Sequence, residues 1–177
     1  MDHADHVSLL RDAVEPGGTW ADVGAGTGAF TLALADLLGR RGQIVAVDRD
    51  PGALSENAAA VAARFPGVAI RTLRADFTDG LALPSLHGIV MANSLHFVAP
   101  DRQVGVVAAL ATHLRAGCVF VVVEYDADHG NPWVPHPFRY DTWVEMAAAA
   151  GLTKPRRLGR VPSRFLGGIY SAVAYRG

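Results

Sequence analysis

Residues Trp20–Phe30, WADVGAGTGAF, decide how this chain folds. Apolar and small residues lead to Val23, five residues with almost no side chain follow from Gly24 to Gly28, and Phe30 resumes an apolar pattern at helical spacing. This order predicts a buried strand, a tight turn and the first turn of a helix. Glycines let a ligand approach the backbone closely, and the free N–H groups at a helix start attract polar or negative groups. The stretch therefore predicts a site for a nucleotide-like cofactor.

Two cofactor classes fit this stretch. Gly24, Gly26 and Ala29 match G-x-G-x-x-A, the fingerprint of dinucleotide binding, and Asp48 follows about 20 residues further on, as that fingerprint requires. The residues from Asp22 to Gly28 also form D-x-G-x-G-x-G, and in this the chain resembles class I S-adenosylmethionine-dependent methyltransferases. The resemblance places Asp22 near the methionine end of S-adenosylmethionine. A carboxylate is stabilised by an ammonium group and repelled by a pyrophosphate, so the methyltransferase interpretation is favoured.

Polar residues at the ends of later strands extend the predicted cofactor site, because ligands of open α/β sheets bind at the carboxyl ends of the strands. Asp48 is placed to accept from both ribose hydroxyls, unless it only caps the next helix. The resemblance implies that Asp76 meets the adenine amino group, with Phe77 on the ring face, and that Asn93 passes the cofactor. Asp76 as a solvated turn residue and Asn93 as a turn amide are the alternatives. The predicted cofactor-binding set is Asp22, Gly24, Ala25, Gly26, Thr27, Gly28, Asp48, Arg49, Asp76, Phe77 and Asn93.

Composition limits the class of protein. The chain has 177 residues, half of them hydrophobic, which predicts one domain over residues 1–177 with one sizeable core. A net charge of −1 suggests no electrostatic grip on nucleic acid. The single cysteine, Cys118, excludes an intramolecular disulfide and a Cys-rich metal site. No apolar run approaches 18 residues and the N-terminus is polar and acidic, so we expect a cytoplasmic enzyme without a membrane span.

Strand and helix patterns alternate along the chain. They predict an α/β fold: a doubly wound, mostly parallel seven-stranded sheet with helices on both faces and an antiparallel C-terminal hairpin. A short helix is expected within residues 1–17, over the sheet edge or the cofactor mouth, loop over Gly80–Gly88, and an irregular insertion over residues 125–140. Helices are expected to be capped by Pro100-Asp101 and by Asp141. The expected strands are Trp20–Val23, Gln43–Val47, Val68–Leu73, His87–Ala92, Cys118–Glu124, Arg156–Val161 and Ile169–Tyr175.

The acceptor side has weaker signals. Asn93-Ser94-Leu95-His96 lacks the prolines and the aromatic residue of N/D-P-P-Y/F, the motif of family members that methylate amino groups of adenine or glutamine. With the neutral net charge, this favours a small-molecule acceptor over nucleic acid. His96 is the candidate catalytic base, since histidine titrates near neutral pH. The candidate substrate-side residues are Glu124, Tyr125, Trp133, His136 and Tyr140. We expect the insertion to form a lid with His96, or else merely to pack onto the sheet.

Two further functions stay open at this stage: an NAD(P)-dependent oxidoreductase, and a non-catalytic cofactor- or partner-binding module on the same fold. Residues Asp126, Asp128, His129 and His136 gather in the insertion, but they lack helical ligand spacing and the H-E-x-x-H motif, so we expect no metal site. The acceptor atom and the oligomeric state are left open.

Overall fold

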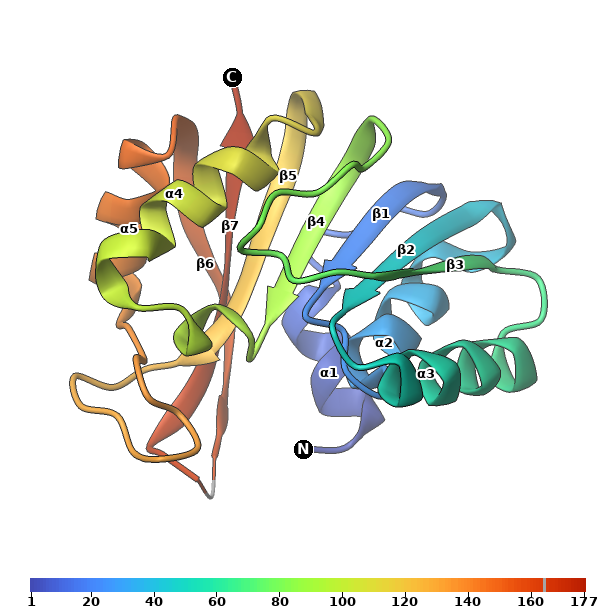
Figure 1. Ribbon diagram of the computed structural model, residues 1–177, viewed down its shortest axis with the longest axis horizontal. Helices are drawn as coiled ribbons and strands as arrows, with labels where there is room; N and C mark the ends of the chain where they lie inside the picture. Colours follow the sequence, from blue (N-terminus) through green and yellow to red (C-terminus); the bar gives the residue numbers. More distant parts are fainter. Residues whose placement is uncertain (164) are drawn as a thin grey trace.

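The computed structural model describes residues 1–163 and 165–177, and it is built on a sheet of seven strands in the order β3-β2-β1-β4-β5-β7-β6 (Figure 1). Neighbouring strands from β3 through β5 are parallel, whereas β7 is antiparallel to both β5 and β6. The predicted fold class is therefore confirmed; Arg164, in the predicted hairpin connection, lies outside the described residues. The strands are β1 Gly18–Val23, β2 Gly42–Asp48, β3 Ala69–Arg74, β4 Leu86–Ala92, β5 Leu114–Tyr125, β6 Leu152–Pro162 and β7 Gly168–Arg176.

The helices cover the sheet on both faces. One face carries α1 (His3–Leu10), α2 (Ala29–Leu38) and α3 (Pro51–Arg64); the other carries α4 (Pro100–Ala111) and α5 (Tyr140–Ala149) (Figure 1). Two short 3-10 turns, η1 (Gly39–Arg41) and η2 (Leu95–Phe97), follow α2 and β4. In the described part of the chain no helix is long and apolar enough to cross a membrane.

The position of β5 in the sheet explains why its sequence is continuously apolar. Val121 and Val123 pack with α1 and α2, while Phe120 and Val122 pack with α4 and α5, so both faces of the strand are buried. The strand begins earlier than the expected Cys118: it starts at Leu114 and continues through a register shift against β4. Gly117 takes a positive φ of 75° at this irregularity, which a glycine accommodates at little cost.

Helix α1 lies within the expected residues 1–17, and the starts of two other helices needed correction. Helix α1 ends at Leu10, because the chain then tightens into a turn in which Ala13 N–H donates to the Leu10 carbonyl. It packs on α2, β6 and β7. Helix α4 is capped by Ala99 and starts at Pro100, whose fixed φ suits a first helical position. Helix α5 is capped by Arg139, which leaves Asp141 in its first turn and not at the cap.

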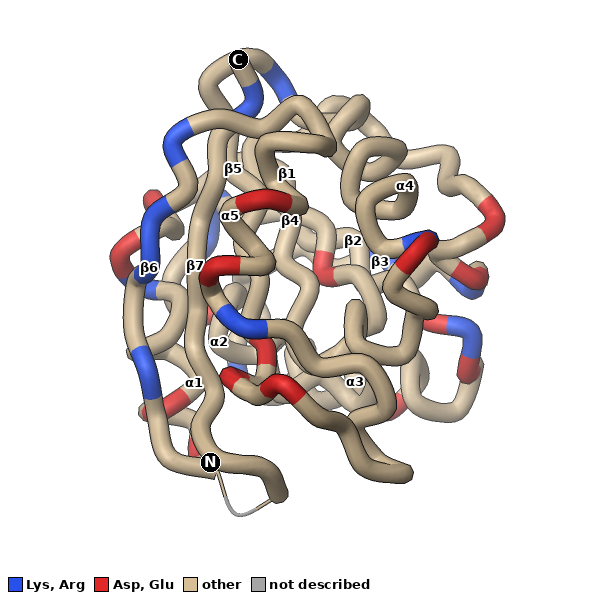
Figure 2. Tube along the Cα trace, turned by 90° about the vertical axis from the view of Figure 1, so that its left-hand side faces the viewer, with Lys and Arg blue, Asp and Glu red and all other residues tan. Residues whose placement is uncertain are grey.

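The edge strand β6 is strongly basic. Its sequence contains Lys154, Arg156, Arg157 and Arg160. Figure 2 shows Lys and Arg, in blue, along β6. Charged side chains on an edge strand oppose pairing with another sheet. Two of these residues also have local partners, because Arg157 lies over the Tyr140 ring and Arg160 pairs with Asp126. We therefore assign this basic edge to protection of the sheet.

Candidate cofactor and acceptor site

The three glycines of the first turn have different physical roles. All three have positive φ. A Cβ on Gly24 would lie 2.4 Å from the Ser94 Cβ, and one on Gly28 would lie 2.7 Å from the Asn57 side chain, whereas one on Gly26 would meet nothing within 4 Å. Gly24 thus allows close packing against the turn after β4, and Gly28 against α3. Gly26 instead faces open space.

That space is a cavity of about 750 Å³ at the carboxyl ends of β1, β2, β3 and β4. It contains most of the predicted cofactor set, since Gly24, Gly26, Thr27, Asp48, Arg49, Asp76, Phe77 and Asn93 line it. Ala25, Gly28 and Asp22 do not line it. His136, predicted for the substrate side, lines this cavity as well. The lining residues that the sequence did not indicate are Asp50, Ala53, Ala75, Thr78, Ser94, Phe97, Val98, Ala99 and Arg102.

Asp48 joins the glycine turn to the end of β2. Its Oδ2 accepts from the Gly26 N–H at 2.8 Å and its Oδ1 accepts from the Asp50 N–H at 2.9 Å. Each carboxylate oxygen has a second lone pair, so Asp48 retains the capacity to accept from a ligand. Because the Gly26 N–H already donates to Asp48, it is not free to donate to a pyrophosphate, which would meet the negatively charged carboxylate instead.

Asp76 and Phe77 follow β3 and line the same cavity. The Asp76 Oδ1 accepts from both the backbone N–H and the hydroxyl of Thr78, at 2.9 and 2.8 Å. These hydrogen bonds, the backbone one first, hold the pKa of Asp76 below its usual value. Asp76 is therefore an anion held in a local turn, with one oxygen left for a ligand.

Asp22 supports the glycine turn from behind. Its side chain is 1% exposed, and its Oδ2 accepts from the Thr31 hydroxyl at 2.6 Å. Asn57 on α3 donates to the same hydroxyl at 2.8 Å and to the Gly26 carbonyl at 3.3 Å. Burial raises the pKa of Asp22 to about 7, against the opposing Thr31 hydrogen bond. Asn57 was missed, although a polar residue between Leu54 and Val61 on the buried face of α3 is a readable signal.

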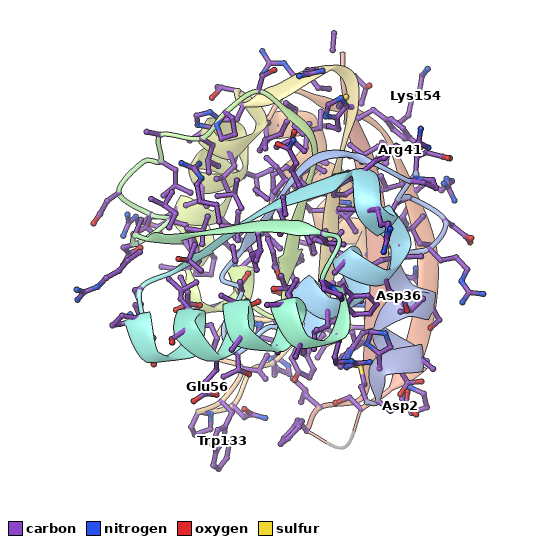
Figure 3. All side chains as sticks on the ribbon, turned by 90° about the vertical axis from the view of Figure 1, so that its right-hand side faces the viewer. Asp2, Asp36, Arg41, Glu56, Trp133 and Lys154 are labelled. Atoms are coloured by element: carbon purple, nitrogen blue, oxygen red, sulfur yellow. The ribbon has the colours of Figure 1, made fainter. Side chains whose placement is uncertain are left out.

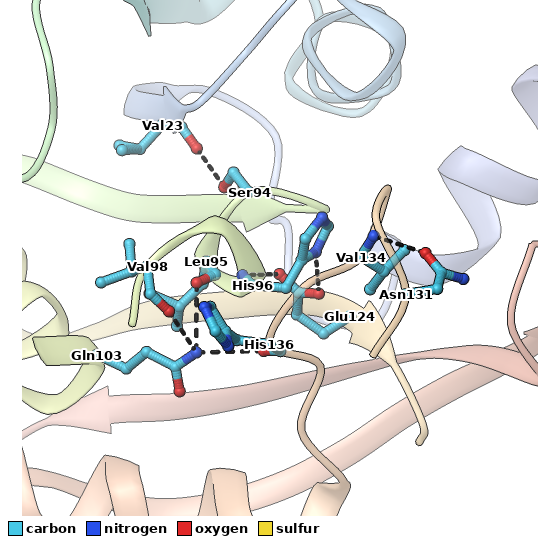
Figure 4. Close-up of polar contacts among 10 residues, drawn as sticks. All are labelled: Val23, Ser94, Leu95, His96, Val98, Gln103, Glu124, Asn131, Val134 and His136. Carbon is cyan, nitrogen blue, oxygen red and sulfur yellow. Dashed lines mark hydrogen bonds and ion pairs between the residues drawn. The ribbon is translucent and has the colours of Figure 1, made fainter. Parts of the chain in front are cut away.

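Side-chain hydrogen bonds join the turn after β4 to other segments (Figure 4). Ser94 donates to the Val23 carbonyl at 2.9 Å. Gln103, buried on α4, donates to the carbonyls of Val98 and His136 at 3.1 and 3.3 Å, and so joins the turn to the insertion. Asn93 has a φ of +51°, and its Oδ1 is buried with no partner among the described residues. A buried amide without a partner is a candidate ligand contact.

His96 and Glu124 form a buried pair. The Glu124 Oε2 lies 2.7 Å from the His96 Nδ1, and its Oε1 accepts from the His96 backbone N–H at 3.2 Å. The two side chains are 2% and 0% exposed. The other ring nitrogen, Nε2, points away from Glu124 (Figure 4). His96 does not line the cofactor cavity, and its ring packs against the Tyr125 ring in an edge-to-face contact, 5.6 Å between centroids.

The remaining substrate-side candidates separate in space. Tyr125 lies at the end of β5, where it lines a second cavity that Asn93 also lines. Trp133 is 73% exposed and projects away from the body of the molecule (Figure 3). The Tyr140 hydroxyl donates to the Pro155 carbonyl at 3.3 Å, and its ring packs against Tyr170. The structure therefore does not bring Trp133 or Tyr140 to the cofactor cavity, because Tyr140 faces β6 and β7 and Trp133 faces solvent.

The charges of the cavity suit S-adenosylmethionine. Carboxylates from Asp48, Asp50 and Asp76 surround the open space before Gly26, against the guanidinium groups of Arg49 and Arg102. This excess of negative charge attracts a sulfonium and an ammonium group and disfavours a pyrophosphate. Across the described residues, no group of three or more His, Cys, Asp and Glu could hold a metal ion.

The fold and the site together indicate a methyltransferase that binds a nucleoside-containing cofactor, and the comparison with known families agrees. Residues 21–117 match the family described as "Methyltransferase domain", and the chain belongs to this family. It is a class I S-adenosylmethionine-dependent methyltransferase domain, and the dinucleotide alternative is set aside.

Three known proteins illustrate the likeness. Ribosomal RNA small subunit methyltransferase H from Verminephrobacter eiseniae is 36% identical over 97 residues, 53% of this chain and 28% of that protein. The chain thus spans less than a third of this curated relative. The Burkholderia thailandensis 1,6-didemethyltoxoflavin-N1-methyltransferase superposes with a TM-score of 0.74 at 18% identity, over 99% of this chain and 78% of that one. An O-methyltransferase family 2 protein from Planctomyces limnophilus, in complex with apigenin, gives 0.71 at 16% identity, over 97% and 57%. The two structures establish the fold.

Proposed function

We propose that this protein transfers the methyl group of S-adenosylmethionine to a small molecule. The observation that carries the proposal is the cavity before Gly26, where a Cβ would meet nothing and where carboxylates follow two successive strands at Asp48 and Asp76. The glycine turn allows the cofactor to approach, Asp48 is free to accept from its ribose, and Asp76 with Phe77 would hold the adenine. Asp22 would act through the turn that it supports.

The protein's own contribution to such a reaction is placement and exclusion of water. When bound, S-adenosylmethionine supplies an electrophilic methyl group: the acceptor's lone pair forms the new bond, the electrons of the broken carbon–sulfur bond stay on sulfur, and an O–H or N–H acceptor loses its proton. We propose His96 as the group that takes this proton at Nε2. Glu124 occupies Nδ1, which fixes the tautomer and leaves the Nε2 lone pair free in the neutral ring.

A small-molecule acceptor is supported by the site and by the printed names of structural neighbours. One methylates 1,6-didemethyltoxoflavin and another was solved with apigenin. The turn Asn93-Ser94-Leu95-His96 also lacks the motif of amino-group methylation. Ribosomal RNA is the second candidate acceptor, favoured by the 36% identity to an rRNA methyltransferase.

Calorimetry with S-adenosylhomocysteine and NAD tests the cofactor. We expect binding of the first and none of the second; NAD binding without a response to S-adenosylhomocysteine would refute the proposal. Turnover is then sought by detecting S-adenosylhomocysteine released in the presence of uncharged aromatic compounds or of ribosomal subunits. His96 is tested by His96→Gln in the active assay. Loss of the acidic limb of the kcat–pH profile at unchanged cofactor affinity supports a proton acceptor, whereas a lower rate with an unchanged profile assigns it a structural role.

A further inference from the structure

An open groove lies at the amino ends of β1, β2 and β3, at the opposite edge of the sheet from the cofactor cavity. Its volume is about 700 Å³. Gln43 in this groove and Asp48 in the cofactor cavity lie at opposite ends of β2, about 16 Å apart at a strand rise of about 3.3 Å per residue. A ligand in the groove would therefore occupy a site separate from that of the cofactor. The groove is lined by Thr19, Gln43, Ile44, Val45, Ala69, Ile70, Arg71, Ala82, Leu83, Pro84, Ser85 and Arg115.

The groove is open because no helix joins β3 to β4. In α/β folds of this kind, helices normally cover both faces of the sheet. Residues 75–85 instead form an irregular connection, which crosses the face of the sheet that carries α4 and α5 (Figure 1). Those two helices pack on the other half of the sheet, against β5, β6 and β7. The register pairs Arg71 with Val45, so both side chains point to the face that the helices leave uncovered.

The groove combines an apolar floor with positive charge. Val45 is buried in the floor, and Leu83 in the connection is half-buried against the same core. Arg71 and Arg115 are exposed, and they are the charged residues among those that line the groove. No ion pair formed by the described residues involves either arginine. Two cations without an acidic partner, next to an apolar surface, suit an anion that has an apolar part.

Neutral groups hold Arg115 in position without using up its donors. Its Nε donates to the Ser85 hydroxyl at 3.1 Å, and its Nη1 lies 3.0 Å from the Nε2 of His87. The other ring nitrogen of His87, Nδ1, accepts from the Thr19 backbone N–H at 2.9 Å. A neutral imidazole has one acceptor nitrogen, so His87 cannot accept from both donors. Because the Thr19 N–H is fixed in β1, the exposed guanidinium is the donor that is left for an external acceptor.

We propose that the groove between the β3–β4 connection and the amino ends of β1, β2 and β3 binds a free aliphatic carboxylate. The carboxylate accepts from Arg115, because a guanidinium matches the two oxygens of a carboxylate with two parallel N–H donors. Arg71 adds a second positive charge, and the aliphatic chain lies against Leu83 and the floor at Val45. The groove is not part of the cofactor cavity, and the inference does not rest on the proposed function.

Octanoate is the probe for this groove. Acetate has the same charge without the chain, and 1-octanol has the same chain without the charge. Calorimetry on the full chain measures the affinities, and amide chemical shifts of isotope-labelled protein locate the ligand. We expect octanoate to bind at least about tenfold more tightly than either acetate or 1-octanol. The shifts should gather at residues 82–85 and at Arg115, and the amides of Gly26 and Thr27 in the cofactor cavity should not move.

Arg115→Gln removes the cation, and Arg74→Gln is its matched control, because Arg74 is exposed on β3 and lines neither the groove nor the cofactor cavity. Octanoate binding should weaken at least about fivefold in Arg115→Gln and stay unchanged in Arg74→Gln. Ala82→Glu places a carboxylate at the exposed rim of the groove and should abolish binding by charge repulsion. Melting temperatures check that each variant is folded.

Four results would each overturn the inference: no binding of octanoate, equal binding of 1-octanol, equal losses in Arg115→Gln and Arg74→Gln, or octanoate shifts that gather at the cofactor cavity. Unchanged binding in Ala82→Glu would also place the ligand elsewhere.

Discussion

Replacing single glycines by alanine separates the role of the first turn in folding from its role in binding. Gly26 and Gly28 lie two residues apart and both have positive φ, of 50° and 99°. A methyl group on Gly26 would enter the cofactor cavity, where nothing lies within 4 Å. A methyl group on Gly28 would lie 2.7 Å from the Asn57 side chain, which is buried between α3 and the turn.

The expected magnitudes follow from these two environments. Alanine at a positive φ costs about 1–2 kcal/mol, and this is the whole expected cost of Gly26→Ala to the free energy of unfolding. Gly28→Ala adds overpacking against Asn57, about 1–3 kcal/mol more. Binding should show the opposite order. The Gly26→Ala methyl group occupies space that the cofactor needs, so its affinity for S-adenosylhomocysteine should fall at least about tenfold, or roughly 1.4 kcal/mol.

The assay combines urea unfolding with calorimetric titration of S-adenosylhomocysteine. Gly80→Ala is the matched control, because Gly80 has a φ of 85°, is exposed, meets nothing within 4 Å and lines neither cavity. It should lose the backbone cost alone and keep its affinity. Wild-type affinity in Gly26→Ala would refute the placement of the cofactor before this glycine. Equal stability of Gly28→Ala and Gly80→Ala would refute the packing argument.

Three further outcomes are expected. The pKa of Asp22 is raised to about 7 in the folded protein, so its contribution to the free energy of unfolding, ~4 kcal/mol at most, is complete below pH ~4 and is lost as the pH rises through 7. Urea unfolding at pH 5 and pH 8 should show this loss in the wild type and not in Asp22→Asn. Asp48→Ala should weaken S-adenosylhomocysteine binding by about 1–3 kcal/mol in calorimetry with little change in Tm; the reverse pattern would make Asp48 a structural cap. His96→Ala should lower the free energy of unfolding by about 1–3 kcal/mol because it leaves the buried Oε2 of Glu124 without its ring partner, and an unchanged denaturation midpoint would contradict this.

The cofactor half of the site was predictable because its residues are ordered by local geometry. A glycine turn follows one strand, and Asp48 and Asp76 each end another, so parallel pairing alone brings them together. Eight residues of the predicted cofactor set line the cavity. Asp22 was chosen for a contact with the ligand, yet its carboxylate turns toward Thr31 behind the loop. Strand alternation alone does not tell which way the side chain before a turn will point.

The acceptor half was less predictable because its parts are far apart in the sequence. The expected lid residues Trp133 and Tyr140 were selected by composition, and composition does not distinguish a ring over a cavity from one in solvent or one packed on β6 and β7. Gln103 looks like any polar residue of α4 until its carbonyl partners are known.

The cofactor side and the proposed acceptor side of the site are stabilised by different parts of the chain, and this difference bears on function. The cofactor side is fixed by one short turn and the strand ends beside it, with Asp48, Thr31 and Asn57 as its supports. The proposed acceptor side lies at the turn after β4, the insertion and the β6–β7 connection, which side-chain hydrogen bonds of Gln103 and Asn131 join. Changes in these connections can therefore reshape the proposed acceptor side while the glycine turn stays intact. The segments proposed to select the acceptor are therefore not those that hold the glycine turn, so this fold can keep one cofactor site while its acceptor site changes.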